Sequence, residues 1–392
     1  MSKHNAELIF KLLDDYHISN EHLAPRKFRA SVQHSVKYFL PFTQSLFRAI
    51  PTTTETPTKI EFRMGKLKQE LNLPTLEIYS GKNSASSQAT DLSYAYYILN
   101  LAYLANHTSA AVKLFMHAYK TLCKQLNNRP VHIYNAGPGL VSSLLAYYCH
   151  SHPGSRFYLI QHAVYQLCHK PYYYQIDFDS TTSWVWSNAQ ARIHKQQGVK
   201  HVKVLPNLKI SSVKEQATVD WATRLDLVII GELSEKYYPD YNGRFQQTMR
   251  EAIGVLRQQQ VAVTIGNIYF KPHPRSTNKA EWKSICATEG WEYTVKMPES
   301  NNFAVIGAFS TYLIEVIAEG IVGFQVQSEK LRALIDYDNY CDYTSMISLS
   351  VDKKATLDET VLNQAKKPYI DPDYLCIDEN WIEIYRKSIF ES

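Results

Sequence analysis

One loop of the chain holds an imidazole between two prolines, with a cationic side chain at each end. The loop is residues 271–275 (KPHPR), and it follows an apolar, β-branched run at 261–266 that predicts a strand. Prolines on both sides of His273 fix φ and disfavour a helix, so we expect the imidazole on a stiff, extended loop. His273 would then donate a hydrogen bond to a leaving phosphate, while Lys271 or Arg275 supplies positive charge. The alternative is a proline-rich turn that binds no ligand.

A pair of hydroxyl side chains stands further along the chain. Ser310 and Thr311 follow a predicted strand at 303–307 and precede an apolar segment at 312–318 that predicts a helix. Side chains of this type are favoured at the start of a helix, where backbone N–H groups and the helix dipole bind anions. We therefore expect Ser310 and Thr311 to bind the same phosphate as His273. An ordinary helix cap is the alternative.

An acidic side chain closes the most apolar strand predicted in the chain. Residues 225–230 (LDLVII) predict a buried strand, and Gly231 and Glu232 follow it. In doubly wound sheets, ligands bind at the carboxyl ends of the strands. Glu232 would act there as a general base for an acceptor hydroxyl or as a nucleophile that forms a covalent adduct. A turn or helix-capping glutamate is the alternative.

Three further polar residues stand at strand ends in the first half of the chain. Residues 131–134 and 157–160 predict two parallel strands joined by an apolar helical segment. Asn135 opens the loop after the first strand, and Gln161 and His162 close the second. We expect Asn135 and Gln161 to contact a nucleotide donor, and His162 to face donor or acceptor as a catalytic residue; a hydrogen-bonded core histidine is the alternative. Neither a G-x-G-x-x-G loop nor a P-loop is present, which disfavours nicotinamide and ordinary ATP chemistry.

Strands and helices alternate in both halves of the chain. A length of 392 residues exceeds one ordinary core. We predict an α/β protein with two Rossmann-like, doubly wound domains that face each other across a cleft. The expected domains are 1–215, with a helical first part, and 216–370; residues 371–392 form a C-terminal segment.

The composition excludes several classes of protein. Hydrophobic residues make up 45% and charged residues 20% of the chain, which is typical of a globular protein. No apolar run approaches the roughly 18 residues that a membrane-spanning helix needs, and no hydrophobic leader follows Met1. The six cysteines lack the spacing of zinc ligands or of a C-x-x-C pair, so we expect reduced thiols and a cytoplasmic protein.

The charges are distributed unevenly along the chain. Residues 1–215 contain 24 Lys and Arg against 12 Asp and Glu, a net charge of +12, while the remainder contains 18 against 25, a net charge of −7. We therefore expect the first half to meet an anionic partner, either a phosphorylated acceptor or an anionic membrane surface. Nucleic acid is disfavoured as a partner, because the chain has no dense Lys/Arg run and no known nucleic-acid-binding motif.

Together these segments resemble bacterial GT-B glycosyltransferases that use CMP-activated acidic sugars, a group that includes sialyltransferases and Kdo transferases. The resemblance spans roughly residues 130–325 and rests on the order of four short segments, 161–162, 231–232, 271–274 and 310–311. Within this group, the chain is most similar to the retaining β-Kdo transferases of O-antigen and capsule assembly.

The resemblance implies CMP-Kdo as donor, a lipid-linked surface glycan as acceptor, and peripheral association with the inner face of the cytoplasmic membrane. It also implies two Rossmann-like domains of the GT-B type, the first on the acceptor side and the second for the nucleotide sugar, with a C-terminal helix at 381–390 that crosses back to the first domain. By the same resemblance, His273, Ser310 and Thr311 would hold the CMP phosphate, and Glu232 would act at the anomeric carbon. Neither a metal nor another cofactor is implied.

Two departures from the family pattern leave alternatives open. Retaining members have an aspartate where this chain has Glu232, and the inverting sialyltransferases have an acidic pair before a glycine, which residues 231–233 do not reproduce. Retention or inversion therefore stays open, as does Kdo or sialic acid as donor. Two other hypotheses remain: a CDP-glycerol-type polyol-phosphate transferase, which shares a His-Pro loop, and a non-catalytic glycan- or nucleotide-binding module.

Overall fold

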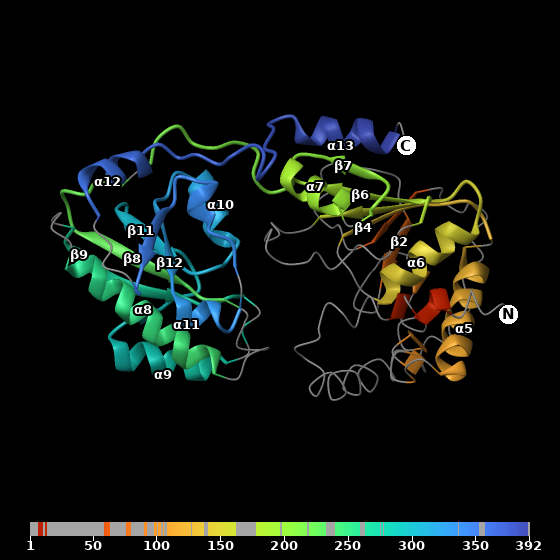
Figure 1. The fold of residues 1–392 in the computed structure, drawn as a ribbon, viewed down its shortest axis with the longest axis horizontal. Helices are drawn as coiled ribbons and strands as arrows, with labels where there is room; N and C mark the ends of the chain where they lie inside the picture. Colours follow the sequence, from red (N-terminus) through yellow and green to blue (C-terminus); the bar gives the residue numbers. More distant parts are fainter. Residues whose placement is uncertain are drawn as a thin grey trace. The chain divides into compact units, whose positions relative to one another are not determined.

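The computed structural model contains two parallel β-sheets, each with its own helices (Figure 1). Contacts between residues divide the chain into two units, Met1–His162 with Pro171–Leu205 and Ile382–Ser392, and Ala163–Lys170 with Pro206–Trp381. The structure describes residues 7–10, 12–13, 59–62, 76–79, 90–91, 98–99, 101–102, 105, 108–126, 128–136, 140–161, 178–196, 198–217, 219–232, 240–258, 263–274, 276, 278–335, 337–352 and 357–390.

The described part of the first unit is built on a seven-stranded parallel sheet in the order β3-β2-β1-β4-β5-β6-β7. Because the strand order reverses between β1 and β4, this sheet is doubly wound. Its strands are β1 (Lys59–Phe62), β2 (Leu76–Tyr79), β3 (Thr90–Asp91), β4 (His132–Ala136), β5 (Arg156–Ile160), β6 (Thr181–Val185) and β7 (Val202–Val204), and its helices include α5 (Ser109–Gln125), α6 (Leu140–Ser151) and α7 (Asn188–Gln196).

The last helix of the chain, α13 (Trp381–Phe390), packs on the sheet of the first unit. The indole N–H of Trp186 donates to the hydroxyl of Tyr385 at 3.2 Å, and the ammonium of Lys203 donates to the hydroxyl of Ser388 at 2.9 Å. Trp186 and Tyr385 are both buried, so this contact belongs to the core. Residues at the end of the sequence thus complete the unit with which the sequence begins.

The described part of the second unit contains a six-stranded parallel sheet in the order β10-β9-β8-β11-β12-β13. Counted from its own first strand, this is the order 3-2-1-4-5-6 of the Rossmann fold, and the winding changes direction between β8 and β11. The strands are β8 (Leu225–Ile230), β9 (Ile265–Lys271), β10 (Glu292–Tyr293), β11 (Phe303–Gly307), β12 (Gly323–Gln327) and β13 (Ile347–Ser350); the helices are α8 (Tyr241–Arg257), α9 (Lys279–Glu289), α10 (Tyr312–Ala318), α11 (Glu329–Arg332) and α12 (Glu359–Ala365), with a 3₁₀ turn at Tyr340–Asp342.

Helices cover both faces of the second sheet. Leu227 and Ile229 of β8 share one core with Phe245 of α8 and with side chains of α9. On the other face, α10 packs closely enough that a Cβ at Gly307 would lie 3.2 Å from Leu313 and 3.6 Å from Ile230. The prediction of an α/β protein with two doubly wound parallel sheets is confirmed by both units. A cleft between them stays a prediction.

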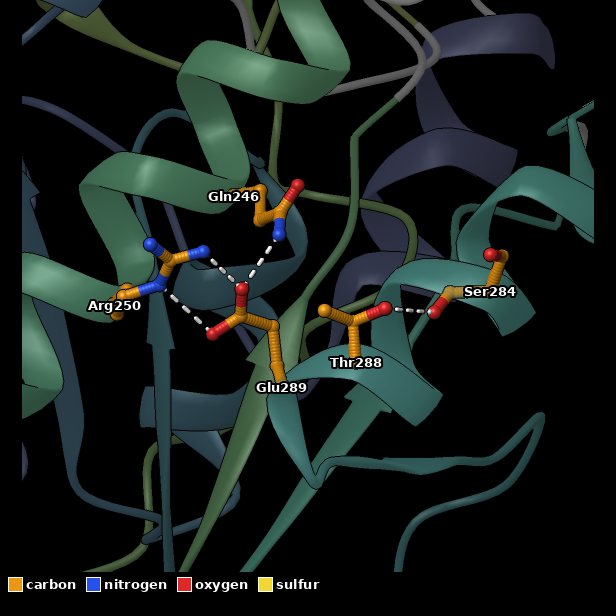
Figure 2. A network of polar contacts seen from close by, with 5 residues as sticks. All are labelled: Gln246, Arg250, Ser284, Thr288 and Glu289. Carbon is orange, nitrogen blue, oxygen red and sulfur yellow. Dashed lines mark hydrogen bonds and ion pairs between the residues drawn. The ribbon is translucent and has the colours of Figure 1, made fainter.

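A polar cluster joins helices α8 and α9 on their outer side (Figure 2). The guanidinium of Arg250 binds both carboxylate oxygens of Glu289, with Nε 2.9 Å from Oε2, and the amide of Gln246 donates to the same carboxylate at 2.5 Å. The hydroxyl of Thr288 donates to the carbonyl of Ser284 at 3.1 Å. Arg250 lowers the pKa of Glu289. This cluster ties two helices together and contains no residue predicted to do chemistry.

One strand limit predicted from the sequence is wrong. The strand before the histidine loop is β9 at Ile265–Lys271, not 261–266. The backbone N–H of Asn267 donates to the carboxylate of Asp226 at 2.7 Å, where the pairing of β8 with β9 is irregular. Beyond this point Ile268 and Phe270 are buried in alternation, which extends the strand. Lys271 is therefore the last residue of a strand and not part of a loop.

Much of the predicted helical first part of the chain lies outside the described residues. The described residues there include strands β1, β2 and β3, which add three members to the first sheet. Where the structure describes the chain, no helix combines the length and the apolar character needed to cross a membrane.

Candidate functional site

Three neighbouring strands of the second unit end in residues predicted to do chemistry. Strand β8 lies between β9 and β11 and runs parallel to both, so the carboxyl ends of the three strands lie at one edge of the sheet. Lys271 ends β9, Glu232 follows β8, and Ser310 follows β11. Ligands of Rossmann-type sheets bind at this edge, where the winding changes direction.

A glycine fixes the start of the histidine loop against the end of β8. The backbone N–H of Gly231 donates to the carbonyl of Lys271 at 2.8 Å. A Cβ at this position would lie 2.8 Å from the ring of Phe270 and 3.0 Å from the backbone of Pro272. Because the backbone of Pro272 cannot move aside easily, only glycine allows the two segments to approach this closely.

The histidine loop closes in a turn, whereas the sequence predicted an extended loop, with a turn as the alternative. Pro272 is buried, His273 is half-buried and Pro274 is exposed. The carbonyl of His273 accepts a hydrogen bond from the backbone N–H of Ser276 at 2.9 Å, which closes the turn. The imidazole is thus carried on a fixed backbone with part of its surface exposed. Arg275 lies outside the described residues.

A cation–π contact joins the end of β9 to the start of α10. The ammonium of Lys271 lies 4.8 Å from the ring centroid of Tyr312, within the range of an energetically significant contact. Burial lowers the pKa of Lys271, and Glu315 acts in the opposite direction. The contact reaches past the end of β8 and brings the histidine loop to the segment that carries Ser310 and Thr311. The two segments predicted to bind one phosphate therefore lie at the same edge of the sheet.

The hydroxyl pair stands at the start of α10 without capping it. Thr311 precedes the first helical residue, and its side chain makes no capping hydrogen bond. The carbonyls of Ser310 and Thr311 accept from the backbone N–H groups of Leu313 and Ile314 at 3.0 and 3.2 Å, so the backbone itself closes this turn. Both side chains are half-buried. Their binding to a phosphate stays a prediction.

Glu232 is buried and its carboxylate is engaged at both oxygens. Its side chain lies among residues of α8 and of the loop after β11, with 3% of the residue exposed. Oε1 accepts from the backbone N–H groups of Phe309 and Ser310 at 2.8 and 2.9 Å, and Oε2 accepts from the hydroxyl of Tyr241 at 2.6 Å. The amide of Ser310, a residue predicted to bind a phosphate, thus binds this carboxylate together with the amide of its neighbour Phe309. Its predicted action at a substrate stays a prediction.

Burial raises the pKa of Glu232 from 4.5 to about 7. The hydrogen bonds from Tyr241, Phe309 and Ser310 act in the opposite direction, because donors stabilise the ionised form. When the acid is protonated on Oε2, that O–H can donate to the oxygen of Tyr241 while Oε1 still accepts from both amides. Both protonation states are therefore compatible with the contacts to the loop after β11.

The segment 308–310 is also held through the carbonyls of Ala308 and Phe309 and through the ring of Phe309. The amide of Gln325 donates to the carbonyl of Ala308 at 2.8 Å, and the hydroxyl of Tyr340 donates to the carbonyl of Phe309 at 2.8 Å. The ring of Phe309 packs against Tyr241 and Tyr337, with centroids 6.1 and 5.5 Å away. Hydrogen bonds and ring packing therefore fix the backbone of this loop.

Sequence reasoning missed Tyr241, Gln325 and Tyr340 as residues that hold this loop. Gln325 carries a usable signal, because it is a polar residue inside the apolar run 322–326, and a buried amide needs partners. Tyr241 and Tyr340 carry no such signal, since the chain contains 28 tyrosines.

Asn135 lies within β4, whereas the sequence predicted it in the loop after that strand, and Gln161 follows β5; both are buried. The amide of Asn135 in β4 donates to the hydroxyl of Ser142 at 3.0 Å. The side-chain oxygen of Gln161, after β5, accepts from the backbone N–H of Trp186 at 2.8 Å. Their predicted contacts with a donor stay predictions. His162 lies outside the described residues. Within the described ranges, no group of three or more His, Cys, Asp or Glu side chains is placed to hold a metal ion.

Comparisons with known proteins add little to this description. No family model matches the chain, and no curated protein matches it. Among solved structures, the chain is similar to UDP-GlcNAc 2-epimerase from Methanocaldococcus jannaschii, solved in complex with UDP-GlcNAc and UDP, with a TM-score of 0.48 and 9% sequence identity over 85% of this chain and 99% of that chain. A likeness at this level bears on no activity, so the assignment of the fold rests on the two sheets described above.

Proposed function

We propose that the chain is a glycosyltransferase that transfers Kdo from CMP-Kdo to a bacterial surface glycan, with the donor phosphate at the carboxyl ends of β8, β9 and β11. The observation that carries this proposal is the contact of Lys271 with Tyr312, which joins the histidine loop to the Ser310–Thr311 segment. It lies where the strand order changes direction in a Rossmann-type sheet, a usual position for a nucleotide.

Each side chain has a distinct role in this proposal. The bond between the anomeric carbon and the phosphate oxygen breaks, and its electron pair stays on the oxygen of the CMP that leaves. His273 donates a hydrogen bond to that oxygen, and Lys271 balances its charge. The hydroxyls of Ser310 and Thr311 donate to the other phosphate oxygens. The acceptor hydroxyl forms the new bond to the anomeric carbon, and its proton passes to the solvent as CMP leaves. Glu232 is not a reacting group here.

The choice of Kdo and of a lipid-linked acceptor follows the sequence resemblance. A basic surface of the first unit supports an anionic partner. The exposed side of α5 presents Lys113, His117, Lys120 and Lys124, and the sequence of this helix contains no acidic residue. Each basic side chain near an anionic bilayer contributes roughly 1 kcal/mol of attraction. We therefore propose that α5 faces the anionic inner surface of the cytoplasmic membrane.

Release of CMP from CMP-Kdo tests the activity. Wild type should turn over, and His273→Ala and Lys271→Ala should each lower kcat/KM about 100-fold, the size of effect seen when a charge-stabilising donor is removed. Arg250→Gln, in the polar cluster between α8 and α9, is the control for a change elsewhere in the unit. Turnover equal to wild type in both site variants would contradict the assignment of these residues.

The products of a donor panel separate the competing activities. Turnover of CMP-sialic acid in place of CMP-Kdo would identify a sialyltransferase, and a phosphodiester product from CDP-glycerol would identify a polyol-phosphate transferase. Binding of CMP without turnover of any donor would identify a non-catalytic module. The NMR spectrum of the product shows directly whether the anomeric configuration is retained.

Sedimentation with lipid vesicles tests the proposed membrane surface. We expect binding to vesicles that contain phosphatidylglycerol, little binding to phosphatidylcholine vesicles, and weaker binding at high salt. Replacement of Lys113, Lys120 and Lys124 by glutamine should abolish the difference between the two vesicles. Equal binding of the substituted and wild-type chains to anionic vesicles would rule out α5 as the surface.

A further inference from the structure

We infer that Glu232 is a positioning residue, whose buried carboxylate holds the segment 308–310 so that Ser310 and Thr311 are presented to the donor phosphate. This inference rests on the proposed function for the identity of the ligand. It assigns Glu232 a role different from attack on the sugar or removal of a proton from the acceptor.

The contacts of the carboxylate occupy three of its roughly four lone-pair sites, and burial keeps the remaining site away from a substrate. A general base or a nucleophile must reach the reacting atom directly or through one water. Oε1 of Glu232 already accepts two backbone N–H bonds and Oε2 accepts the hydroxyl of Tyr241, with 3% of the residue exposed. A reacting group would have to break these bonds and unbury the side chain first.

The partners of Glu232 belong to a loop whose backbone is paired group by group. The carbonyl of Ala308 binds Gln325, the N–H of Phe309 binds Glu232, the carbonyl of Phe309 binds Tyr340, and the N–H of Ser310 binds Glu232 again. A backbone held at four successive polar groups adopts one conformation. The direction of the Ser310 and Thr311 side chains therefore depends on those bonds.

The length of the side chain supports this role. Glu232 follows β8, and its amide partners follow β11, the next strand in the sheet. A carboxylate must therefore reach from the end of one strand to the loop after its neighbour. An aspartate would place its oxygens one methylene short of the two amides, whereas a glutamine would place an acceptor oxygen where Oε1 lies and a donor beside Tyr241.

Two substitutions at this position distinguish holding from reacting. If Glu232 holds the loop, Glu232→Gln should keep kcat and the KM for CMP-Kdo within about threefold of wild type. Glu232→Asp should raise that KM about tenfold or more. A reacting carboxylate gives the opposite order, because glutamine removes the charge and the proton acceptor while aspartate retains both. That order, or identical kinetics in all three proteins, would overturn the inference.

Amide hydrogen exchange tests the holding without any donor. In the free protein, the N–H groups of Phe309 and Ser310 should be protected in wild type and in Glu232→Gln, and should exchange at least tenfold faster in Glu232→Asp. Arg250→Gln should leave both unchanged, as a control in the same unit. Unchanged protection in Glu232→Asp would contradict this inference but not the proposed function. Failure of wild type to bind CMP, with the exchange pattern as expected, sinks only the proposed function.

Discussion

The two sheets have the same order in their first six strands, but different residues lie at the carboxyl ends of those strands. In the first sheet these positions hold Asn135 and Gln161, which are uncharged, buried and bonded to Ser142 and to the backbone of Trp186. In the second sheet, a buried carboxylate stands beside a half-buried lysine and a half-buried imidazole.

This difference shows that a polar residue at a strand end is not by itself a sign of chemistry. Asn135, Gln161 and Glu232 are all buried, and each bonds to a neighbouring element of its own unit. Lys271 and His273 keep part of their surface exposed, as a ligand requires. In our proposal, burial distinguishes the residues that position a loop from those that bind the ligand.

The largest expected effect on stability compares the two sheets directly. Glu232→Ala should lower the free energy of unfolding by about 4 kcal/mol, because it leaves two half-buried backbone N–H groups and the buried hydroxyl of Tyr241 without their acceptor. Gln161→Ala leaves one amide without its acceptor and should cost about 1–2 kcal/mol. Urea denaturation measures both. An equal loss of unfolding free energy in the two variants would show that the carboxylate of Glu232 stabilises its unit no more than the amide of Gln161 does.

A second prediction contrasts the pH dependence of the two units. Burial raises the pKa of Glu232 to about 7, so its contribution to stability is complete below pH 4.5 and falls as the pH rises to 7, on the order of 3 kcal/mol. Burial lowers the pKa of His194 in the first unit to about 4, so its contribution grows as the pH rises to 6.5.

Subtraction of variants isolates these two contributions. The unfolding free energy of wild type minus that of Glu232→Gln should fall between pH 4.5 and 7, and that of wild type minus His194→Asn should rise from pH 4 to 6.5. Urea titrations at several pH values measure the differences. Differences that stay flat with pH, or that change in the same direction, would contradict the assigned burial of these groups.

Two glycine substitutions in the second unit are expected to have smaller effects on stability. Gly231→Ala should destabilise the second unit by about 2 kcal/mol, because the new methyl group meets Phe270 and the backbone of Pro272. Gly243→Ala in α8 is the matched control, since nothing lies within 4 Å of its Cβ position. That change should stabilise the helix by roughly 0.5–1 kcal/mol. Thermal unfolding of the two variants should shift in opposite directions; a shift in the same direction would refute the close approach at Gly231.

The smallest effect is expected on the outer surface of the second unit. Arg250→Gln breaks an ion pair between α8 and α9 in which the Arg250 side chain is exposed and the Glu289 side chain is mostly covered (Figure 2). Such pairs contribute little and are screened by salt. The variant should unfold at a slightly lower urea concentration than wild type at low salt, and at the same concentration in 1 M salt. A loss as large as that of Glu232→Ala would show that this cluster, and not the strand ends, holds the unit together.

The sequence allowed much of the second unit to be predicted. The apolar run 225–230 and the segments 303–307 and 312–318 mark β8, β11 and α10, because strands buried on both faces are continuously apolar. The prolines beside His273 predicted an extended loop, whereas the structure closes a turn there through the bond from the N–H of Ser276 to the carbonyl of His273. The limits of β9 could not be predicted, because its pairing with β8 is irregular where the N–H of Asn267 bonds to Asp226, and no local sequence pattern shows this.

The partners of Glu232 could not be predicted from the sequence. Its oxygens bind amides of Phe309 and Ser310, and these come close only because β11 adds beside β8 in the sheet. Strand order depends on the packing of the whole unit, so a local sequence pattern does not predict it. A carboxylate at a strand end looks the same in sequence whether it faces a substrate or a neighbouring loop.

A crystal structure of the chain with CMP bound tests the central claim most directly. Our account predicts the phosphate at the carboxyl ends of β8, β9 and β11, within hydrogen-bonding distance of His273 and of the Ser310 or Thr311 hydroxyl, with Glu232 still bonded to the amides of Phe309 and Ser310. A phosphate bound beside Asn135 and Gln161 instead, or one in direct contact with the Phe309 and Ser310 amides in place of Glu232, would contradict it.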